Sequence, residues 1–236
     1  MSGHATGLVL AGGASRRMGG IDKRAVRVGG RPLLLAAVEA VRDVCEEVLI
    51  AVGDDPPPVA LRNVRVVGDL RPGCGPLAGL EAGLAAASHP VIVVVAGDHP
   101  AAAPAVLADL RDRLAGDTGL DAVVLGTDHG PQPLVGAYRG SCLGAVSGLL
   151  DAGERRARAV LDVLRTEVVA TGEWRHLDPQ LATAVDLDTP EDLEAWRRRG
   201  DGDGDPRDRD PGAVPTDEPP PSGPPEPDLD AERARP

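Results

Sequence analysis

The stretch VIVVVAGDHP, residues 91–100, decides the fold that we expect. Its first six residues are apolar without interruption and rich in valine, which favours a strand over a helix. A strand that is apolar on both faces is typical of a parallel sheet that helices cover on both sides. The run ends in Gly, Asp, His and Pro, so the chain turns at Asp98.

Outward from this strand, short β-branched runs alternate with longer stretches of helical spacing. We expect strands at residues 8–10, 48–52, 64–67, 91–96, 122–125, 168–170 and 182–185. We expect helices at 32–45, 76–87, 104–114 and 190–198, each opening on a proline, which a first helical turn tolerates. This order predicts an α/β fold with a doubly wound, mostly parallel sheet and helices on both faces.

The charge of the chain is unevenly distributed. The whole chain of 236 residues carries a net charge of −12, and residues 200–236 alone contribute −7 together with ten prolines. We therefore divide the chain into a folded domain, 1–199, and a disordered acidic tail rich in Pro and Gly, 200–236. The domain has no broad basic surface, so we expect no nucleic-acid partner.

The cysteines and the apolar runs bear on the compartment. The three cysteines are widely spaced and show neither a zinc-ligand pattern nor a disulfide framework, as expected of thiols in a reducing cytoplasm. No signal-peptide pattern opens the chain. The longest apolar run, 91–96, is far shorter than the roughly 18 residues that a membrane helix needs. We expect a cytoplasmic protein without a membrane partner.

Acidic residues follow several of the expected strands. Asp69 and Asp98 each follow one after a single glycine, and Asp186 and Asp188 come after the last. Because ligands of such sheets bind at the carboxyl ends of the strands, near the switch in strand order, we expect these carboxylates on one edge.

The stretch LVLAGGASRRMGGIDKRAV, residues 8–26, follows the first strand with glycines and cations. Its spacing matches neither GxxxxGK[ST] nor GxGxxG, so the common phosphate-loop and dinucleotide readings fail. Backbone glycines combined with mobile cations suit a triphosphate whose pyrophosphate must be neutralised and released. The alternative is a surface turn with solvated charges.

Asp98 is the natural magnesium ligand, because Mg²⁺ needs only one or two carboxylates besides phosphate oxygens and water. The alternative is a turn residue, since Asp-x-Pro also favours a turn. We expect His99 to be a turn residue rather than a general base. Asp186 is the candidate second ligand, whereas Asp188 is as well placed to cap the helix that follows it.

The first stretch closely resembles the LAGG-x-S-x-RMG-x-DK signature of the nucleotidyltransferases that include molybdenum cofactor guanylyltransferase. Further similar segments follow in the order of that family: GRPLL, GPLAGLEAGL, GDHP and DLDTPEDL. The resemblance covers nearly all of 1–199.

This resemblance implies a Rossmann-like nucleotidyltransferase fold and one reaction. A phosphate of the acceptor attacks the α-phosphorus of a nucleoside triphosphate, forms a phosphoanhydride and expels pyrophosphate. The implied substrates are GTP and a molybdopterin-type acceptor, and the implied cofactor is Mg²⁺. Molybdoenzymes or other cofactor-synthesis proteins are the protein partners that the resemblance suggests.

The resemblance also assigns roles to residues. Asp69 would contact the guanosine, Asp98 would hold Mg²⁺, and Lys23 with Arg17 would neutralise the phosphates as catalytic cations. The backbone that meets the nucleotide would be that of Leu10, Ala11, Gly12 and Gly13. Asp186 and Asp188 replace an asparagine pair of the family, which fits Asp186 as a metal ligand.

The acceptor and the base stay open at this point. The GERR-like turn, with Arg155, Arg156 and Arg158, is a candidate for the acceptor phosphate or an ordinary solvated helix start. GDHP is also close to the GD-x-P of cytidylyl relatives, so CTP or another phosphorylated acceptor is the alternative. A third hypothesis is a non-catalytic nucleotide-binding accessory protein, which the presence of Lys23 and Asp98 disfavours.

Overall fold

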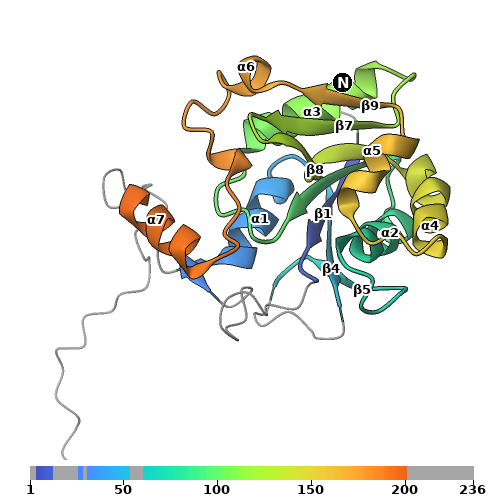
Figure 1. The fold of residues 1–236 in the computed structure, drawn as a ribbon, viewed down its shortest axis with the longest axis horizontal. Helices are drawn as coiled ribbons and strands as arrows, with labels where there is room; N and C mark the ends of the chain where they lie inside the picture. The colour runs from blue at the N-terminus through green and yellow to red at the C-terminus, as the bar shows by residue number, and fades with distance from the viewer. Residues whose placement is uncertain (1–3, 13–25, 29–30, 54–60, 201–236) are drawn as a thin grey trace, which may run out of the picture.

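The structure is a computed structural model, and it describes residues 4–12, 26–28, 31–53 and 61–200. A seven-stranded sheet forms its centre in the order β5-β4-β1-β6-β8-β7-β9 (Figure 1). Its strands are β1 (Ala5–Leu10), β4 (Glu47–Val52), β5 (Arg65–Gly68), β6 (Val91–Ala96), β7 (Ala122–Thr127), β8 (Gly130–Arg139) and β9 (Thr166–Val169). A small antiparallel ribbon pairs β2 (Arg27–Val28) with β3 (Arg31–Pro32).

The strand directions place several loops on one edge. β5, β4, β1 and β6 are mutually parallel, and only β8 runs against its neighbours β6 and β7. β9 pairs parallel with β7. The chain leaves β1 toward β4 on one side and later returns to β6 on the other, so the switch in strand order lies at β1. Ligand sites of open α/β sheets form at such a point.

Helices cover both faces of the sheet. The helices are α1 (Leu33–Arg42), α2 (Pro76–Ala86), α3 (Pro104–Gly116), α4 (Leu143–Asp151), α5 (Val160–Val163), α6 (Thr171–Trp174) and α7 (Pro190–Gly200). Three short 3-10 helices are η3 (Gly140–Cys142), η4 (Ala157–Ala159) and η5 (Ala182–Ala184). One core packs α1 and α3 against the sheet, and a second packs α2 and α4 against the opposite face. Figure 1 shows α2 and α4 together on one side of β1 and α1 on the other.

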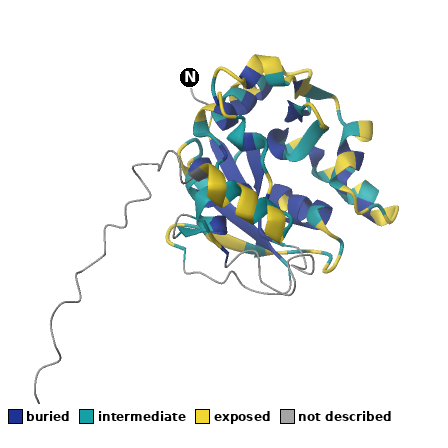
Figure 2. Cartoon of the chain, turned by 60° about the vertical axis from the view of Figure 1, so that its left-hand side comes forward, coloured by how far each residue is buried: buried dark blue, intermediate teal, exposed yellow. Residues whose placement is uncertain are grey.

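The burial of the strands follows from these two layers. Every residue of β1 and of β6 is buried, as expected of strands with apolar cover on both faces. Figure 2 shows the buried ribbon running through the central strands and exposed residues on the outward sides of the helices. The predicted α/β class with a mostly parallel sheet is confirmed.

Helix α2 approaches the sheet closely because two of its positions lack side chains. A Cβ built on Gly83 would lie 2.1 Å from Leu8 Cδ2, and one on Gly79 would lie 3.1 Å from Leu10 Cδ2. Leu8 is itself fully buried, so it has little room to move away. The glycines therefore set how near α2 comes to β1.

The expected strand at 182–185 is wrong. Residues 182–184 form η5, which begins after Leu181 in the left-handed region with a φ of 55°. The buried carboxylate of Asp178 accepts hydrogen bonds from the Thr183 N–H at 2.7 Å and from its hydroxyl at 2.8 Å. This local side-chain network competes with strand pairing and holds the segment as a turn.

The sequence also gave no sign of β8. This strand contains Pro131 and Pro133, which interrupt strand patterns, and its pairing with β7 shifts register between Val124 and Leu125. This register shift accommodates the two prolines within the strand.

The predicted tail lies outside the described residues from 201 onward, so the division at 199 and 200 stays a prediction. Among the helices that the structure describes, none is long and apolar enough to cross a membrane.

Candidate active site

The backbone after β1 lies between two neighbouring strands at the carboxyl edge. The Ala11 N–H donates to the carbonyl oxygen of Ala51 at 2.8 Å, and the Gly97 N–H donates to that of Leu10 at 2.9 Å. Leu10 and Ala11 are buried. These bonds fix residues 10 and 11 between the ends of β4 and β6, where a ligand could reach the backbone.

Asp69 lies against Gly12. Its N–H donates to the Val52 carbonyl oxygen at 3.0 Å, which anchors the residue to the end of β4. A Cβ built on Gly12 would lie 3.6 Å from Asp69 Oδ2 and 3.2 Å from the backbone nitrogen of Gly53. A Cβ on Gly79 would lie 3.6 Å from Asp69 Oδ1, an oxygen that is buried. The two glycines thus leave the space that this carboxylate occupies.

The loop after Asp69 is tied to α2 and α4. Arg71 Nε lies 3.1 Å from Glu81 Oε2, and Arg71 Nη1 lies 2.5 Å from Asp151 Oδ1. Ser147 Oγ donates to Glu81 Oε1 at 2.7 Å. The hydrogen bond to Asp151, followed by the charge of Glu81, outweighs desolvation and raises the pKa of Arg71. Glu81 is buried, so its partners are needed to offset the loss of its hydration.

Asp98 follows β6 and contacts the segment that leads to α7. The Leu187 N–H donates to the Asp98 carbonyl oxygen at 3.1 Å. Asp98 Oδ1 is buried, whereas Asp186, the neighbour of Leu187, is exposed. The structure thus brings the Asp186 segment to the end of β6, although it does so with a turn and not with the expected strand.

A polar network that the sequence did not indicate holds this turn in place. His99 is buried, and its Nδ1 lies 3.0 Å from the carbonyl oxygen of Thr183, so Nδ1 carries the proton. The Thr183 hydroxyl accepts from the Ala103 N–H at 3.0 Å while it donates to Asp178. His99 is therefore a buried anchor of the turn that follows β6.

The first turn of α7 is capped by Thr189 and Asp192. The Thr189 N–H and hydroxyl donate to Asp192 Oδ2 at 2.7 and 2.8 Å, and the Asp192 N–H donates back to Thr189 Oγ1 at 3.1 Å. Asp188 joins this cap through its N–H, 3.1 Å from Asp192 Oδ2. The reciprocal pattern is that of a capping box.

The three arginines of the GERR-like turn differ in their surroundings. Arg156 binds Glu154, with Nη2 2.7 Å from Oε2, and this hydrogen bond leads the contacts that lower the pKa of Glu154 to about 2. The guanidinium of Arg158 lies 3.4 Å from a Cβ built on Gly130. The carbonyl oxygen of Arg155 lies 3.4 Å from a Cβ built on Gly75, at the start of α2. The turn therefore adjoins the loop that follows Asp69.

The candidate residues fall into two groups. Leu10, Ala11, Gly12, Asp69 and Asp98 lie along one edge, at the ends of β1, β5 and β6. Gly13, Arg17 and Lys23 lie outside the described residues. The glycine contacts could have been suspected from GPLAGLEAGL, but the His99 and Thr183 contact joins residues 84 positions apart and has no local signal.

The mostly parallel sheet with helices on both faces has the architecture of a Rossmann-like nucleotidyltransferase. The sequence model of the MobA-like NTP transferase domain matches residues 7–169. The chain belongs to the MobA-like NTP transferase family.

Individual relatives agree with this assignment. The chain is 35% identical over 201 residues to a protein of Chloroflexus aggregans named "Probable molybdenum cofactor guanylyltransferase", which covers 80% of this chain and 91% of that protein. Molybdopterin-guanine dinucleotide biosynthesis protein A from Archaeoglobus fulgidus superposes with a TM-score of 0.72 at 26% identity, over 84% and 99% of the two chains. Rv0371c from Mycobacterium tuberculosis, solved with manganese, shares the fold with a TM-score of 0.59 at 20% identity, over 83% and 98%.

Proposed function

We propose that the chain transfers GMP from GTP to a molybdopterin acceptor and releases pyrophosphate. The observation that carries this proposal is the contact of Asp69 with Gly12, with Asp98 at the end of a strand next to β1. Backbone groups that approach a nucleotide and carboxylates beside them therefore share the switch point of the sheet. The names of the relatives support guanylyl transfer to the molybdenum cofactor.

The nucleotide is recognised at the ends of β1 and β5. The backbone of residues 10–13 receives the nucleotide, because glycine at 12 and 13 leaves no side chain in the way. Asp69 accepts hydrogen bonds from donors of the guanine or ribose. Its anchoring to Val52 holds it in place before the substrate arrives.

The residues at the end of β6 fit a divalent cation, for which Mg²⁺ is the proposed ion. Asp98 has a carboxylate oxygen buried at the edge of the site. The hydrogen bond from Leu187 to Asp98 brings Asp186, the residue before Leu187, to the same end of β6. Hard oxygen donors of this kind suit Mg²⁺. When bound, the ion neutralises charge on the triphosphate and on the departing pyrophosphate. The manganese in Rv0371c is consistent with a divalent ion in this fold.

In this proposal Lys23 and Arg17 neutralise the negative charge of the phosphates. Arginine binds phosphate oxygens through two parallel N–H groups, whereas lysine acts as a point charge. An oxygen of the acceptor phosphate attacks the α-phosphorus, a new P–O–P bond forms, and the bond to the β-phosphate breaks. The chain contributes position and charge rather than covalent chemistry.

In this proposal the phosphate of the acceptor binds at the GERR-like turn. Arg155 adjoins Gly75, and the loop that contains Gly75 follows Asp69. Of the three arginines, Arg156 already binds Glu154, so we assign the acceptor phosphate to Arg155 and Arg158. Protein partners that receive the product would be molybdoenzymes or other cofactor-synthesis proteins.

The test is pyrophosphate release by the purified chain with GTP, CTP, ATP or UTP, each with molybdopterin or a panel of sugar and alcohol phosphates. Turnover with GTP and molybdopterin supports the proposal. Turnover with CTP alone, or with a sugar phosphate alone, assigns the chain to a sister transferase. Nucleotide binding without turnover under all conditions assigns it to an accessory role.

A further inference from the structure

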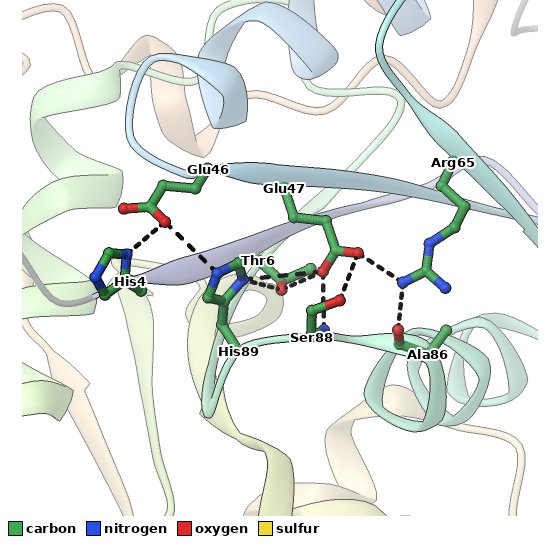
Figure 3. Close-up of polar contacts among 8 residues, drawn as sticks. All are labelled: His4, Thr6, Glu46, Glu47, Arg65, Ala86, Ser88 and His89. Carbon is green, nitrogen blue, oxygen red and sulfur yellow. Dashed lines mark hydrogen bonds and ion pairs between the residues drawn. The ribbon is translucent and has the colours of Figure 1, made fainter.

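Three side chains of types that can coordinate a metal ion meet at the amino edge of the sheet, the edge opposite the candidate active site (Figure 3). They are His4, Glu46 and His89. His4 directly precedes β1, Glu46 directly precedes β4, and His89 lies two residues before β6. These strands are neighbours in the sheet, in the order β4-β1-β6. One ligand atom of each residue lies within 4.8 Å of those of the other two.

The carboxylate of Glu46 is the common partner of the two imidazoles. Its Oε2 pairs with His4 Nδ1 and lies 3.6 Å from His89 Nε2. The two rings are nearly parallel, with an interplanar angle of 13° and centroids 6.0 Å apart. Figure 3 shows both rings turned toward the same carboxylate oxygen. Nitrogen atoms of two imidazoles thus face one carboxylate oxygen.

The neighbouring carboxylate, Glu47, determines where the hydrogen of Thr6 goes. Glu47 accepts hydrogen bonds from the Ser88 N–H at 2.8 Å and from the Ser88 hydroxyl at 3.0 Å, and it forms an ion pair with Arg65, whose Nη2 lies 2.6 Å from Glu47 Oε1. An ionised carboxylate only accepts hydrogen bonds. The Thr6 hydroxyl therefore donates to Glu47 Oε2, at 2.7 Å, and uses its single hydrogen there.

The hydroxyl oxygen of Thr6 in turn fixes the tautomer of His89. Thr6 Oγ1 lies 3.0 Å from His89 Nδ1, and with its hydrogen on Glu47 it accepts from an Nδ1–H. The lone pair of the neutral ring is then on Nε2, the atom that faces Glu46. Metal-binding histidines almost always have their other ring nitrogen held in this way by a polar partner.

We propose that His4, Glu46 and His89 bind a divalent transition-metal ion of the Zn²⁺ type, with water completing the coordination. Two imidazoles and one carboxylate are a ligand set that Zn²⁺ accepts in four-coordinate sites. Bonds of this type would place neighbouring ligand atoms about 3.3 Å apart in a tetrahedral site. The 3.6 Å between Glu46 Oε2 and His89 Nε2 is already near that spacing.

Small rotations of the His4 and Glu46 side chains bring the three ligand atoms to the distances that one ion requires. His4 and Glu46 are 73% and 54% exposed, so both side chains can move without disturbing the core, while His89 is only 22% exposed and is held by Thr6. Imidazole nitrogens suit Zn²⁺ and Co²⁺ better than Mg²⁺, which separates this site from the one at the carboxyl edge. The bound ion would link the beginnings of three adjacent strands.

The test uses the full chain, freed of any purification tag and metal, in excess Mg²⁺ so that the carboxyl-edge site is saturated. Co²⁺ titration followed by visible absorption, and Zn²⁺ competition against a chromogenic chelator, measure affinity and stoichiometry. We expect one ion per chain, with Glu46→Gln and His4→Ala each weakening the affinity at least about tenfold. His129→Ala and His176→Ala, which remove exposed histidines elsewhere, should keep the wild-type affinity.

A second measurement is the melting temperature. Because the ion binds the folded chain through residues that only folding brings together, Zn²⁺ should raise the melting temperature of the wild type. The rise should be absent in Glu46→Gln. Failure of the wild type to bind Zn²⁺ stoichiometrically, or wild-type affinity in Glu46→Gln, would overturn the proposal.

Discussion

The backbone N–H of Leu187 donates a hydrogen bond to the carbonyl oxygen of Asp98 at 3.1 Å, which joins the approach to α7 to the end of β6. Neither residue is near the other in the chain, and no strand pairing is involved. The contact places two acidic residues, Asp98 and Asp186, in neighbouring positions of the fold.

Asp98→Asn should abolish most of the metal-dependent activity while leaving the fold intact. The substitution keeps the shape of the side chain but removes the charge that the cation needs, so we expect kcat to fall by at least about 100-fold. Rates of pyrophosphate release, together with the melting temperature, check this. Asp43→Asn, an exposed residue at the end of α1, is the matched control. An unchanged rate in Asp98→Asn would place the metal elsewhere.

Asp186→Asn should raise the Mg²⁺ concentration required for half-maximal activity, by about tenfold, with a smaller effect on the rate at saturating Mg²⁺. The parallel variant Asp188→Asn tests the neighbouring carboxylate, whose N–H takes part in the α7 cap. A larger effect of Asp188→Asn on the Mg²⁺ requirement would exchange the two roles.

Lys23 is the only lysine of the chain, which makes its role directly observable. Reductive methylation with ¹³C-formaldehyde should give one dimethyl-lysine NMR signal besides that of the amino terminus, and Lys23→Arg assigns it by its loss. GTP with Mg²⁺ should shift this signal, because a phosphate beside the ammonium changes its surroundings. If the signal does not shift at saturating GTP, the result favours the alternative that the stretch at residues 8–26 contains a surface turn with solvated charges.

Gly83→Ala should destabilise the fold by about 1–3 kcal/mol, because the added methyl group would overlap the buried side chain of Leu8. Gly148→Ala is the control, since a Cβ at that position in α4 meets nothing within 4 Å. There the loss of a helical glycine should be neutral or stabilising. Urea unfolding of both variants measures the difference, and equal stabilities would contradict the tight approach of α2.

The ion pair of Asp121 with Arg165 predicts a loss of stability in acid. Hydrogen bonds from the side chain and backbone of Arg165 lower the pKa of Asp121 from 3.8 to about 2. A lowered pKa in the folded state stabilises the fold above the unfolded pKa, and this contribution is lost as the pH falls from about 4 to 2. Unfolding free energies measured across that range should fall less steeply in Asp121→Asn. Identical slopes would contradict the assignment.

Much of the fold could be predicted because strands with two buried faces are apolar throughout, as in β6. The same reasoning placed Asp69 and Asp98 at one edge, since parallel strands end on the same side. Strand β8 could not be predicted, because its prolines are tolerated only through the register shift against β7. That shift depends on a partner strand and has no local pattern.

The turn before α7 shows a second limit. The alternation in TAVDLD resembles a strand, but the carboxylate of Asp178 and the hydroxyl of Thr183 satisfy the backbone locally. The proposed metal site of His4, Glu46 and His89 could not be predicted from the sequence either. Glu46 lies 42 positions from His4, and the two residues meet only when the strands pair.

Arg71 bridges two helices, and this has a mechanical consequence. Its guanidinium binds Glu81 of α2 and Asp151 of α4, and the loop it belongs to begins with Asp69 at the end of β5. Farther along that loop, a Cβ built on Gly75 would lie 3.4 Å from the carbonyl oxygen of Arg155, in the turn that we propose for the acceptor. Because Arg71 ties the loop to α2 and α4, a movement of the loop would require these ion pairs to break or both helices to follow it.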